Sequence, residues 1–229
     1  MIIAVIPARG GSKRIPRKNI KYFHGKPIIA YSIEAAINSR CFDKVIVSTD
    51  DLEIAEIAKK YGAVVPYLRP SNISDDFTGT NVVVKNVIEW FLDQGTIVEY
   101  ACCIYATAPF LQLKYIQEGF NNICKNSFDF SFSVTTFAFP VQRSLRIKDI
   151  GVEPIWPDFI LQRSQDLEEA YHDAGQFYWG TSEAFINEHE LFSSESIPVV
   201  IPRYLTQDID TPEDWTRAEI MFKVLKDFE

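Results

Sequence analysis

Several patterns that would assign a common function are missing from this 229-residue chain. It has neither the G-x-x-x-x-G-K-[ST] motif of P-loop ATPases nor the G-x-G-x-x-G fingerprint of nicotinamide enzymes, which argues against both classes. No apolar run approaches the roughly 20 residues needed to cross a bilayer, and no signal-peptide pattern precedes the first apolar segment. We therefore expect a cytoplasmic protein without a membrane partner.

The chain has few cysteines and fewer basic than acidic residues. Cys41, Cys102, Cys103 and Cys124 lack metal-ligand spacing, and the central two fall in an apolar segment that favours buried thiols over a disulfide or a catalytic pair. This use of cysteine fits a reducing compartment. A formal charge of -8 and a pI near 5.0 disfavour a nucleic-acid partner. A small anionic substrate would need a locally basic pocket.

Short apolar runs alternate with stretches of helical spacing along most of the chain. This alternation predicts a doubly wound, mainly parallel sheet in one domain over residues 1–229. The run at 128–135 alternates Phe with polar residues, so we expect a strand buried on one face. The predicted strands are 2–6, 44–48, 63–68, 100–105, 128–135, 176–181 and 198–202. The predicted helices are 27–40, 52–61, 80–92, 113–124 and a last one from 212.

Helix boundaries are marked by capping residues. Asp50 with Glu53 resembles a capping box, Gly62 suits the end of that helix, and Thr80 or Asn81 suits the start of the next. Thr211 followed by Pro212 predicts the start of the final helix.

The segment from about 136 to 174 differs from the rest. Pro140, Pro154 and Pro157 interrupt it, and helical periodicity is lost until about Asp166. We predict a protruding β-hairpin or arm inserted in the domain.

The loop after the first strand is glycine-rich and basic. The Cβ-free Gly10 and Gly11 let backbone amides approach a ligand closely, and every charged residue before Glu34 is a cation. Amides and cations that converge after a strand predict an anion site, and a polyphosphate is the favoured anion. The alternative is a solvated basic loop. The cations are Arg9, Lys13, Arg14, Arg17, Lys18, Lys21 and Lys26, of which Arg14 and Arg17 are the weakest candidates.

Two carboxylates lie near the other end of the chain. Asp208 and Asp210 are two residues apart, so an extended backbone directs both to the same side. Paired carboxylates beside a nucleotide favour Mg²⁺, which takes one or two carboxylates and completes its shell with phosphate and water. The alternative is that they only prepare the start of the final helix.

Two motifs carry a family resemblance. Residues 8–19 (ARGGSKRIPRKN) and the Asp-x-Asp-Thr at 208–211 resemble the signatures of the CMP-sugar-acid synthetases, which include the CMP-sialic acid synthetases. These enzymes join CMP from CTP to a 2-keto sugar acid and release pyrophosphate. The resemblance implies a three-layer αβα Rossmann-like nucleotidyltransferase fold with a mainly parallel sheet, and a homodimer formed through the protruding arm.

The resemblance also suggests roles on the nucleotide side. Arg69 and the turn at 78–80 fall where the family recognises cytidine, and Asp208 and Asp210 match its Mg²⁺ ligands. We expect Arg9, Lys18, Asp208 and Asp210 to be catalytic through positioning and charge neutralisation. No general base stands out, so metal-assisted deprotonation of the sugar hydroxyl is a hypothesis. The expected nucleotide-binding residues are Ala8, Arg9, Gly10, Gly11, Ser12, Lys13, Lys18, Asn19, Arg69, Thr78 and Thr80.

The sugar side departs from the sialic acid pattern. Residues 171–176 (YHDAGQ) stand where those enzymes carry an Arg-Pro-Asn-Gly run, and they resemble the branch acting on pseudaminic acid, a nine-carbon sugar acid. The sugar carboxylate then needs another cation. Sialic, legionaminic or Kdo acceptors remain alternatives, as does a non-catalytic nucleotide-binding protein. The expected sugar-binding residues are Tyr105, Arg143, Arg163, His172, Asp173 and Gln176.

Overall fold

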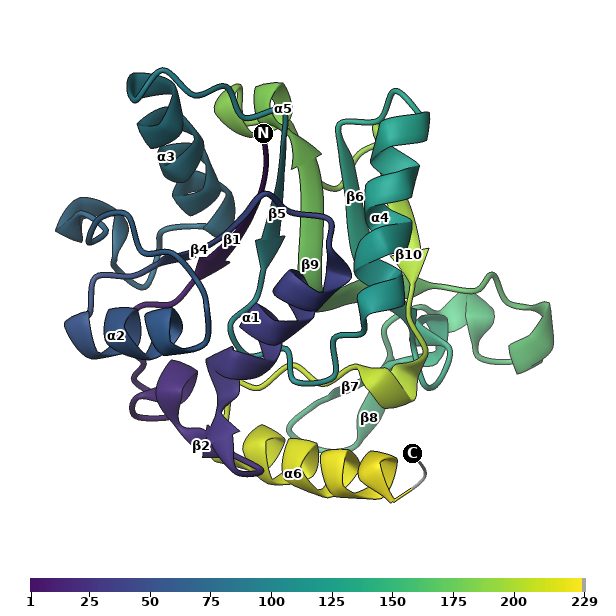
Figure 1. Cartoon of the computed structure of the whole chain (residues 1–229). Coiled ribbons are helices and arrows are strands. Elements are labelled where there is room, and N and C mark those ends of the chain that lie inside the picture. The colour runs from purple at the N-terminus through teal and green to yellow at the C-terminus, as the bar shows by residue number, and fades with distance from the viewer. Residues whose placement is uncertain (228–229) are drawn as a thin grey trace.

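The computed structural model describes residues 1–227 and has a six-stranded sheet with helices on both faces (Figure 1). The strand order is β10-β6-β9-β5-β1-β4, and only β9 runs antiparallel to its neighbours. This confirms the predicted three-layer, mainly parallel fold. The strands of this sheet are β1 Ile2–Pro7, β4 Lys44–Ser48, β5 Tyr100–Ile104, β6 Phe130–Thr136, β9 Tyr171–Thr181 and β10 Ser196–Val200.

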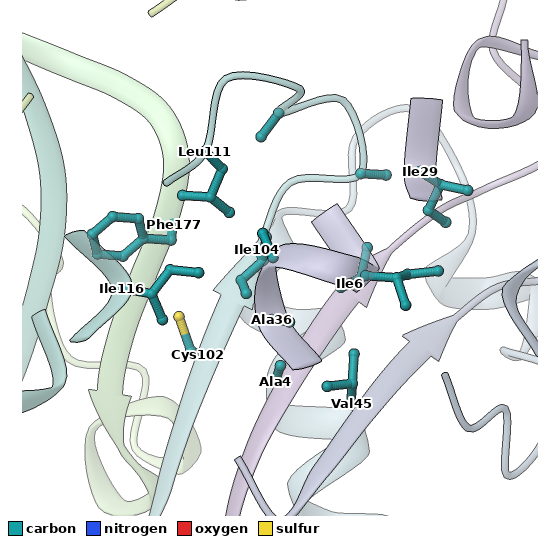
Figure 2. Packing of buried hydrophobic residues seen from close by; sticks show 14 of the residues in the cluster. Ala4, Ile6, Ile29, Ala36, Val45, Cys102, Ile104, Leu111, Ile116 and Phe177 are labelled. Carbon is teal, nitrogen blue, oxygen red and sulfur yellow. The ribbon is translucent and has the colours of Figure 1, made fainter. Parts of the chain in front are cut away.

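Three helices cover one face of the sheet. In Figure 2, Ala4 and Ile6 of β1 and Ile104 of β5 face Ile29 and Ile116, which belong to the covering helices. These side chains are fully buried, so the helices dock through an apolar stripe. The covering helices are α1 Ile28–Ser39, α2 Leu52–Lys60 and α4 Leu113–Lys125.

Helices α3 (Thr80–Asp93) and α5 (Ser182–Ile186) cover the other face. Ile3 and Val5 of β1 join Val84 and Ile88 of α3 in that core. Successive residues of β1 therefore enter opposite cores, which explains why the strand reads as an unbroken apolar run.

Strand β6 corrects one prediction. Phe130 and Phe132 pack toward α3 and α5, but the polar side chains on the other face are buried as well: Ser131, Ser133 and Thr135. The prediction of a strand buried on one face was wrong, because α4 covers the serine face.

The predicted strand at 63–68 is not a regular strand. The segment touches β4 only through isolated bridges, Ile46 to Val64 and Thr49 to Leu68. Pro66 lies between the two bridges, and its missing N–H interrupts a continuous ladder. The predicted strand at 198–202 is displaced by two residues, since β10 covers Ser196–Val200.

Two of the predicted helix caps were wrong, although both helices begin where expected. Asp51, not Asp50, caps α2 by accepting from the amide of Ile54 at 3.0 Å, and Gly79 is the residue before α3. Gly62 follows α2 with a φ of +94°, as a helix end favours.

The last helix, α6 (Pro212–Lys226), confirms its predicted start. Thr211 caps it, and Asp214 completes a reciprocal capping box.

Residues 137–170, between β6 and β9, form the arm, which leaves the body beside β10 (Figure 1). The predicted hairpin is present as β7 (Leu145–Ile147) and β8 (Val152–Pro154), which pair antiparallel. Strand β9 begins at Tyr171, earlier than the predicted 176. Short 3₁₀ turns at Val141–Arg143, Pro157–Phe159 and Ser164–Asp166 complete the arm.

The carboxyl ends of the parallel strands meet at one edge, where α6 lies (Figure 1). Trp215 of α6 packs with Phe23 and Ile28 from the chain that follows the first loop. This packing brings the C-terminal helix to the loop after β1. The small pair β2 (Tyr22–Phe23) and β3 (Lys26–Pro27) lies there too. Within residues 1–227, no helix has both the length and the apolar character required to span a membrane.

Candidate active site

A cavity of about 490 Å³ opens at the carboxyl ends of β1 and β5. Four separate segments line it: the loop after β1, the stretch from Arg69 to α3, the residues after β5, and the approach to α6. Ligands in open α/β sheets collect at this edge. The lining residues are Pro7, Arg9, Ser12, Lys13, Arg14, Lys18, Asn19, Arg69, Ile73, Asp75, Asp76, Thr78, Thr80, Val83, Tyr105, Ala106, Thr107 and Asp210.

Main-chain hydrogen bonds hold the loop after β1 in place. The amide of Ala8 donates to the carbonyl of Ser48 at 2.9 Å, and Asn19 Nδ2 donates to the carbonyl of Arg9 at 3.0 Å. Ala8 is fully buried, so its role is packing at the end of β1. Asn19 lines the cavity and also fixes the loop, so it holds Arg9 against the same space.

The two loop glycines have different surroundings. A Cβ on Gly10 would lie 2.6 Å from Asp51 Oδ2, and its amide donates to Asp50 Oδ1 at 2.9 Å. Gly10 therefore allows the loop to approach the start of α2. A Cβ on Gly11 would meet nothing within 4 Å, so packing does not require glycine there, and Gly11 does not line the cavity.

The Arg17 side chain points away from the cavity and contacts the start of α2. Its guanidinium donates to Asp51 Oδ1 at 3.0 Å and pairs with Glu53, and it does not line the cavity. Arg17 holds the pKa of the Asp51 carboxyl down at about 2, mainly through this hydrogen bond. Sequence reasoning ranked Arg17 low as a ligand residue, and its observed contacts are structural.

The two ends of the chain meet at Lys18. Its Nζ donates to the carbonyl of Ile209 at 2.6 Å and lies 3.2 Å from Asp210 Oδ1. Arg14 reaches the same carboxylate oxygen at 2.9 Å. The basic loop therefore meets Asp210, one of the two C-terminal carboxylates, in the cavity wall.

Asp208 lies beside the cavity and does not line it. The Asp208 side chain is partly exposed to solvent. Partial desolvation of its carboxylate by the surrounding protein, and then the nearby charge of Asp210, raise the pKa of Asp208. A cation would relieve this repulsion. Within residues 1–227, no three His, Cys, Asp or Glu side chains cluster as a metal site. The carboxylates of Asp208 and Asp210, two hard oxygen donors beside this cationic cavity, nevertheless fit Mg²⁺, because phosphate and water would supply its other ligands.

Arg69 brings a buried cation to the opposite wall. It is 5 % exposed, its Nε donates to Ser74 Oγ at 3.1 Å, and burial lowers the pKa of its guanidinium. Its amide donates to the carbonyl of Thr49 at 2.7 Å, which fixes the start of this wall to the end of β4. Arg69, Thr78 and Thr80 all line the cavity, and their binding of cytidine stays a prediction.

The acidic pair beside this wall was missed from the sequence. Asp75 Oδ1 accepts from the amides of Phe77 and Thr78 at 2.9 and 2.7 Å, and so builds the turn. Asp76 instead crosses the cavity to form ion pairs with Arg9 and Lys13. In the sequence, the only indication of a role for Asp76 is that it belongs to an acidic pair in a polar segment, while the loop after the first strand is wholly basic.

A family model described as cytidylyltransferase matches residues 3–201. The chain belongs to the cytidylyltransferase family. The matched range contains the basic loop, the Arg69 wall and β5, and it ends before Asp208 and Asp210. The enzyme class predicted from the two motifs is confirmed.

Curated relatives are similar to this cytidylyltransferase over nearly its full length. The pseudaminic acid cytidylyltransferase of Campylobacter jejuni is 46% identical over 97% of this chain and 96% of its own. The CMP-N,N'-diacetyllegionaminic acid synthase of Legionella pneumophila is 29% identical over 97% of both chains. A solved CMP:2-keto-3-deoxy-manno-octonic acid synthetase complexed with CTP superposes with a TM-score of 0.71 over 97% of this chain and 98% of its own, at 16% identity, and shares the fold.

The predicted sugar-side residues of this cytidylyltransferase are more dispersed. Tyr105 lines the cavity, whereas Gln176 is buried and donates from Nε2 to the carbonyl of Leu205. His172 packs against Phe137, with ring centroids 4.8 Å apart, and Asp173 accepts from the Tyr178 hydroxyl at 2.6 Å.

The two arginines predicted on the sugar side lie on the arm. Arg143 donates to Ser164 Oγ at 3.2 Å, and Arg163 forms a two-point pair with Asp166 at 2.6 and 3.0 Å. Neither arginine lines the cavity. Their role in binding the sugar therefore stays a prediction.

Proposed function

We propose that this cytidylyltransferase joins CMP from CTP to pseudaminic acid and releases pyrophosphate. The observation that carries the proposal is the convergence of Lys18, Arg14 and Asp210 on one cavity in a chain 46% identical to a pseudaminic acid cytidylyltransferase. A cationic pocket in an acidic protein suits a triphosphate and an acid as its two substrates.

The proposed reaction is a displacement at the α-phosphate of CTP. The anomeric oxygen of the sugar acid forms the new bond to phosphorus while the bond to the bridging oxygen breaks, and pyrophosphate leaves with both electrons of that bond. The hydroxyl proton passes to solvent. Arg9, Ser12, Lys13 and Lys18 would hold the triphosphate, and Asn19 the ribose or a phosphate oxygen. The residues act by positioning and by neutralising charge.

Cytidine is proposed to lie against the Arg69 wall. Thr78 and Thr80 offer hydroxyls there, and the buried Arg69 guanidinium supplies a cation that has a neutral Ser74 hydroxyl as its hydrogen-bond partner. Buried charged donors give strong discrimination between ligands that satisfy them and ligands that do not.

Mg²⁺ is the proposed metal, with Asp208 and Asp210 as its protein ligands. When bound, it supplies positive charge against the phosphates. Lys18 and Arg14 are proposed to orient the Asp210 carboxylate, because both contact its Oδ1.

A homodimer formed through the arm is also proposed. The arm exposes several large apolar side chains, among them Ile150 and Leu161 at 96% each, a composition that favours burial against a second copy. Sedimentation equilibrium of Ile147→Glu tests this, and a dimer that persists unchanged would remove the arm from the interface.

The proposed location is the cytoplasm, and no nucleic-acid partner is proposed. All four cysteines are free thiols, and burial raises the pKa of Cys103 to about 12, so these groups suit a reducing compartment.

The test is pyrophosphate release from CTP with four acids in parallel: pseudaminic, legionaminic, sialic and Kdo. We expect the highest kcat/KM with pseudaminic acid, no release without an acid, and loss of release on chelation of Mg²⁺. Preference for another acid would reassign the acceptor. CTP binding without release for any acid would favour the non-catalytic alternative.

A further inference from the structure

Each cation that lines the cavity and belongs to the loop after β1 faces a carboxylate. Lys18 and Arg14 face Asp210, while Arg9 and Lys13 both face Asp76. Asp76 uses its two oxygens separately, Oδ1 toward Arg9 and Oδ2 toward Lys13. A phosphate group bridges two cations in the same manner. The Asp76 carboxylate therefore stands where an anionic ligand would bind.

The neighbouring carboxylate has a different task. Asp75 bonds to Phe77 and Thr78 within its own turn, and it pairs with no cation among the residues that the structure describes. The two adjacent acids therefore have different roles: Asp75 stabilises the turn, and Asp76 connects that turn to the basic loop through ion pairs.

The segment that carries Asp76 is anchored at its ends and exposed in the middle. Arg69 fixes one end through the Thr49 carbonyl, and Val83 is buried just inside α3 at the other. Between them, the 3₁₀ turn Ser71–Ile73 buries no residue, and Phe77 is 92% exposed. Few packed contacts would be lost if the turn moved away from the loop.

We propose that Asp76 is an internal competitor for polyphosphate, holding Arg9 and Lys13 in the empty site and giving them up when the ligand enters. The inference rests on the proposed function, in which these two cations hold the triphosphate of CTP. We expect the competition to affect pyrophosphate release most directly, because the Asp76 carboxylate pairs again with Arg9 and Lys13 as pyrophosphate leaves them.

This competition raises the concentration at which any anion fills the site. A triphosphate also reaches Lys18 and Arg14, so it can offset the loss of the Asp76 pairs. Inorganic phosphate is too small to engage the whole set. Asp76 therefore keeps weak anions out of the loop and shortens the residence of pyrophosphate.

The test compares Asp76→Asn with Asp75→Asn by titration calorimetry of pyrophosphate at fixed ionic strength, without nucleotide. Both variants remove one charge from the same turn, and Asp75→Asn keeps a side-chain carbonyl oxygen that can accept the turn's hydrogen bonds. We expect Asp76→Asn to bind pyrophosphate about tenfold more tightly, since two partly exposed ion pairs no longer oppose binding. Asp75→Asn should stay within about twofold of the wild type. Asp76→Ser is the second neutral variant, used if Asp76→Asn does not fold.

Two results would overturn the inference. Unchanged or weaker binding on loss of Asp76 would make the carboxylate a support for the loop, and equal tightening in Asp75→Asn would make the effect one of general charge. Pyrophosphate alone tests the inference independently of the base. If no acid stimulated pyrophosphate release from CTP, the proposed function would fail while the Asp76 result still stood.

Discussion

The proposed nucleotide side and the proposed sugar side of this enzyme are built in different ways. Arg9 and Lys18 come from one short loop, are 32 and 19% exposed, and reach partners more than 60 residues away in sequence. Arg143 and Arg163 lie on the arm and bond to Ser164 and Asp166 within that same arm. A phosphate site can thus be assembled by one loop at a sheet edge. An acceptor site on an arm depends on where the arm is placed.

The strongest test of this contrast is to remove Asp210, which joins the two ends of the chain. We expect Asp210→Asn to lower kcat at least about 1,000-fold, because metal-borne charge stabilisation is worth several kcal/mol. Asp208→Asn should behave similarly. Glu213→Gln, an exposed change three residues on, is the control, and initial rates of pyrophosphate release are the measurement. Full activity in both aspartate variants would end the metal assignment.

Lys18 tests the loop itself. We expect Lys18→Met to lower kcat/KM for CTP about 100-fold, since a charged donor aimed at the reacting phosphate is lost. Lys21→Met is the matched control, because Lys21 lies over the Trp215 ring, 4.2 Å from its centroid, and outside the cavity. Equal losses in both variants would indicate damage to folding rather than loss of a ligand contact.

Arg163 tests the sugar side alone. We expect Arg163→Ala to raise KM for the sugar acid roughly tenfold, the loss of one charged hydrogen bond, while KM for CTP stays within about twofold. Arg146→Ala is the control on the same arm, where Arg146 pairs with Glu153. If the KM for the acid is the same in both variants, the cation for its carboxylate lies elsewhere.

The smallest expected effect concerns the face of the loop turned away from the cavity. Asp51 has a folded pKa of about 2, below its usual 3.8, so its stabilising effect is complete above about pH 4 and is lost as pH falls through about 2. We expect Asp51→Asn to lose about 1 kcal/mol of unfolding free energy at pH 7. The gap should close between pH 4 and pH 2 in urea titrations. A gap that persists at pH 2 would show that the ion pair with Arg17 is not its source.

Much of the fold could be predicted because its signals are local. The unbroken apolar run of β1 and the Thr211–Pro212 start of α6 each follow from a few adjacent residues. Some of the errors came from tertiary contacts. Asp50 and Asp51 are both residues that favour a helix start. Asp51 caps α2, whereas the Asp50 carboxylate accepts a hydrogen bond from the amide of Gly10.

The candidate site likewise has parts that local sequence signals predict and parts that depend on tertiary contacts. The charge segregation of the first loop and the spacing of Asp208 and Asp210 could be read from the sequence, and the loop does meet Asp210 in the structure. Asp76 could not be assigned, because its partners Arg9 and Lys13 are more than 60 residues away and only the folded loop presents them. Arg14 and Arg17, the two weakest candidates, could be told apart only by their contacts, since Arg14 pairs with Asp210 and Arg17 with Asp51.

The antiparallel strand β9 has a consequence for how this scaffold can vary. It pairs with β5 on one side and with β6 on the other, so both attachment points of the arm are clamped inside the sheet. We therefore expect changes in the length of residues 137–170 to leave β1 and the loop that follows it in place. If the arm binds the acceptor, as proposed, exchanging this one segment would alter the sugar specificity while the loop after β1 keeps its structure.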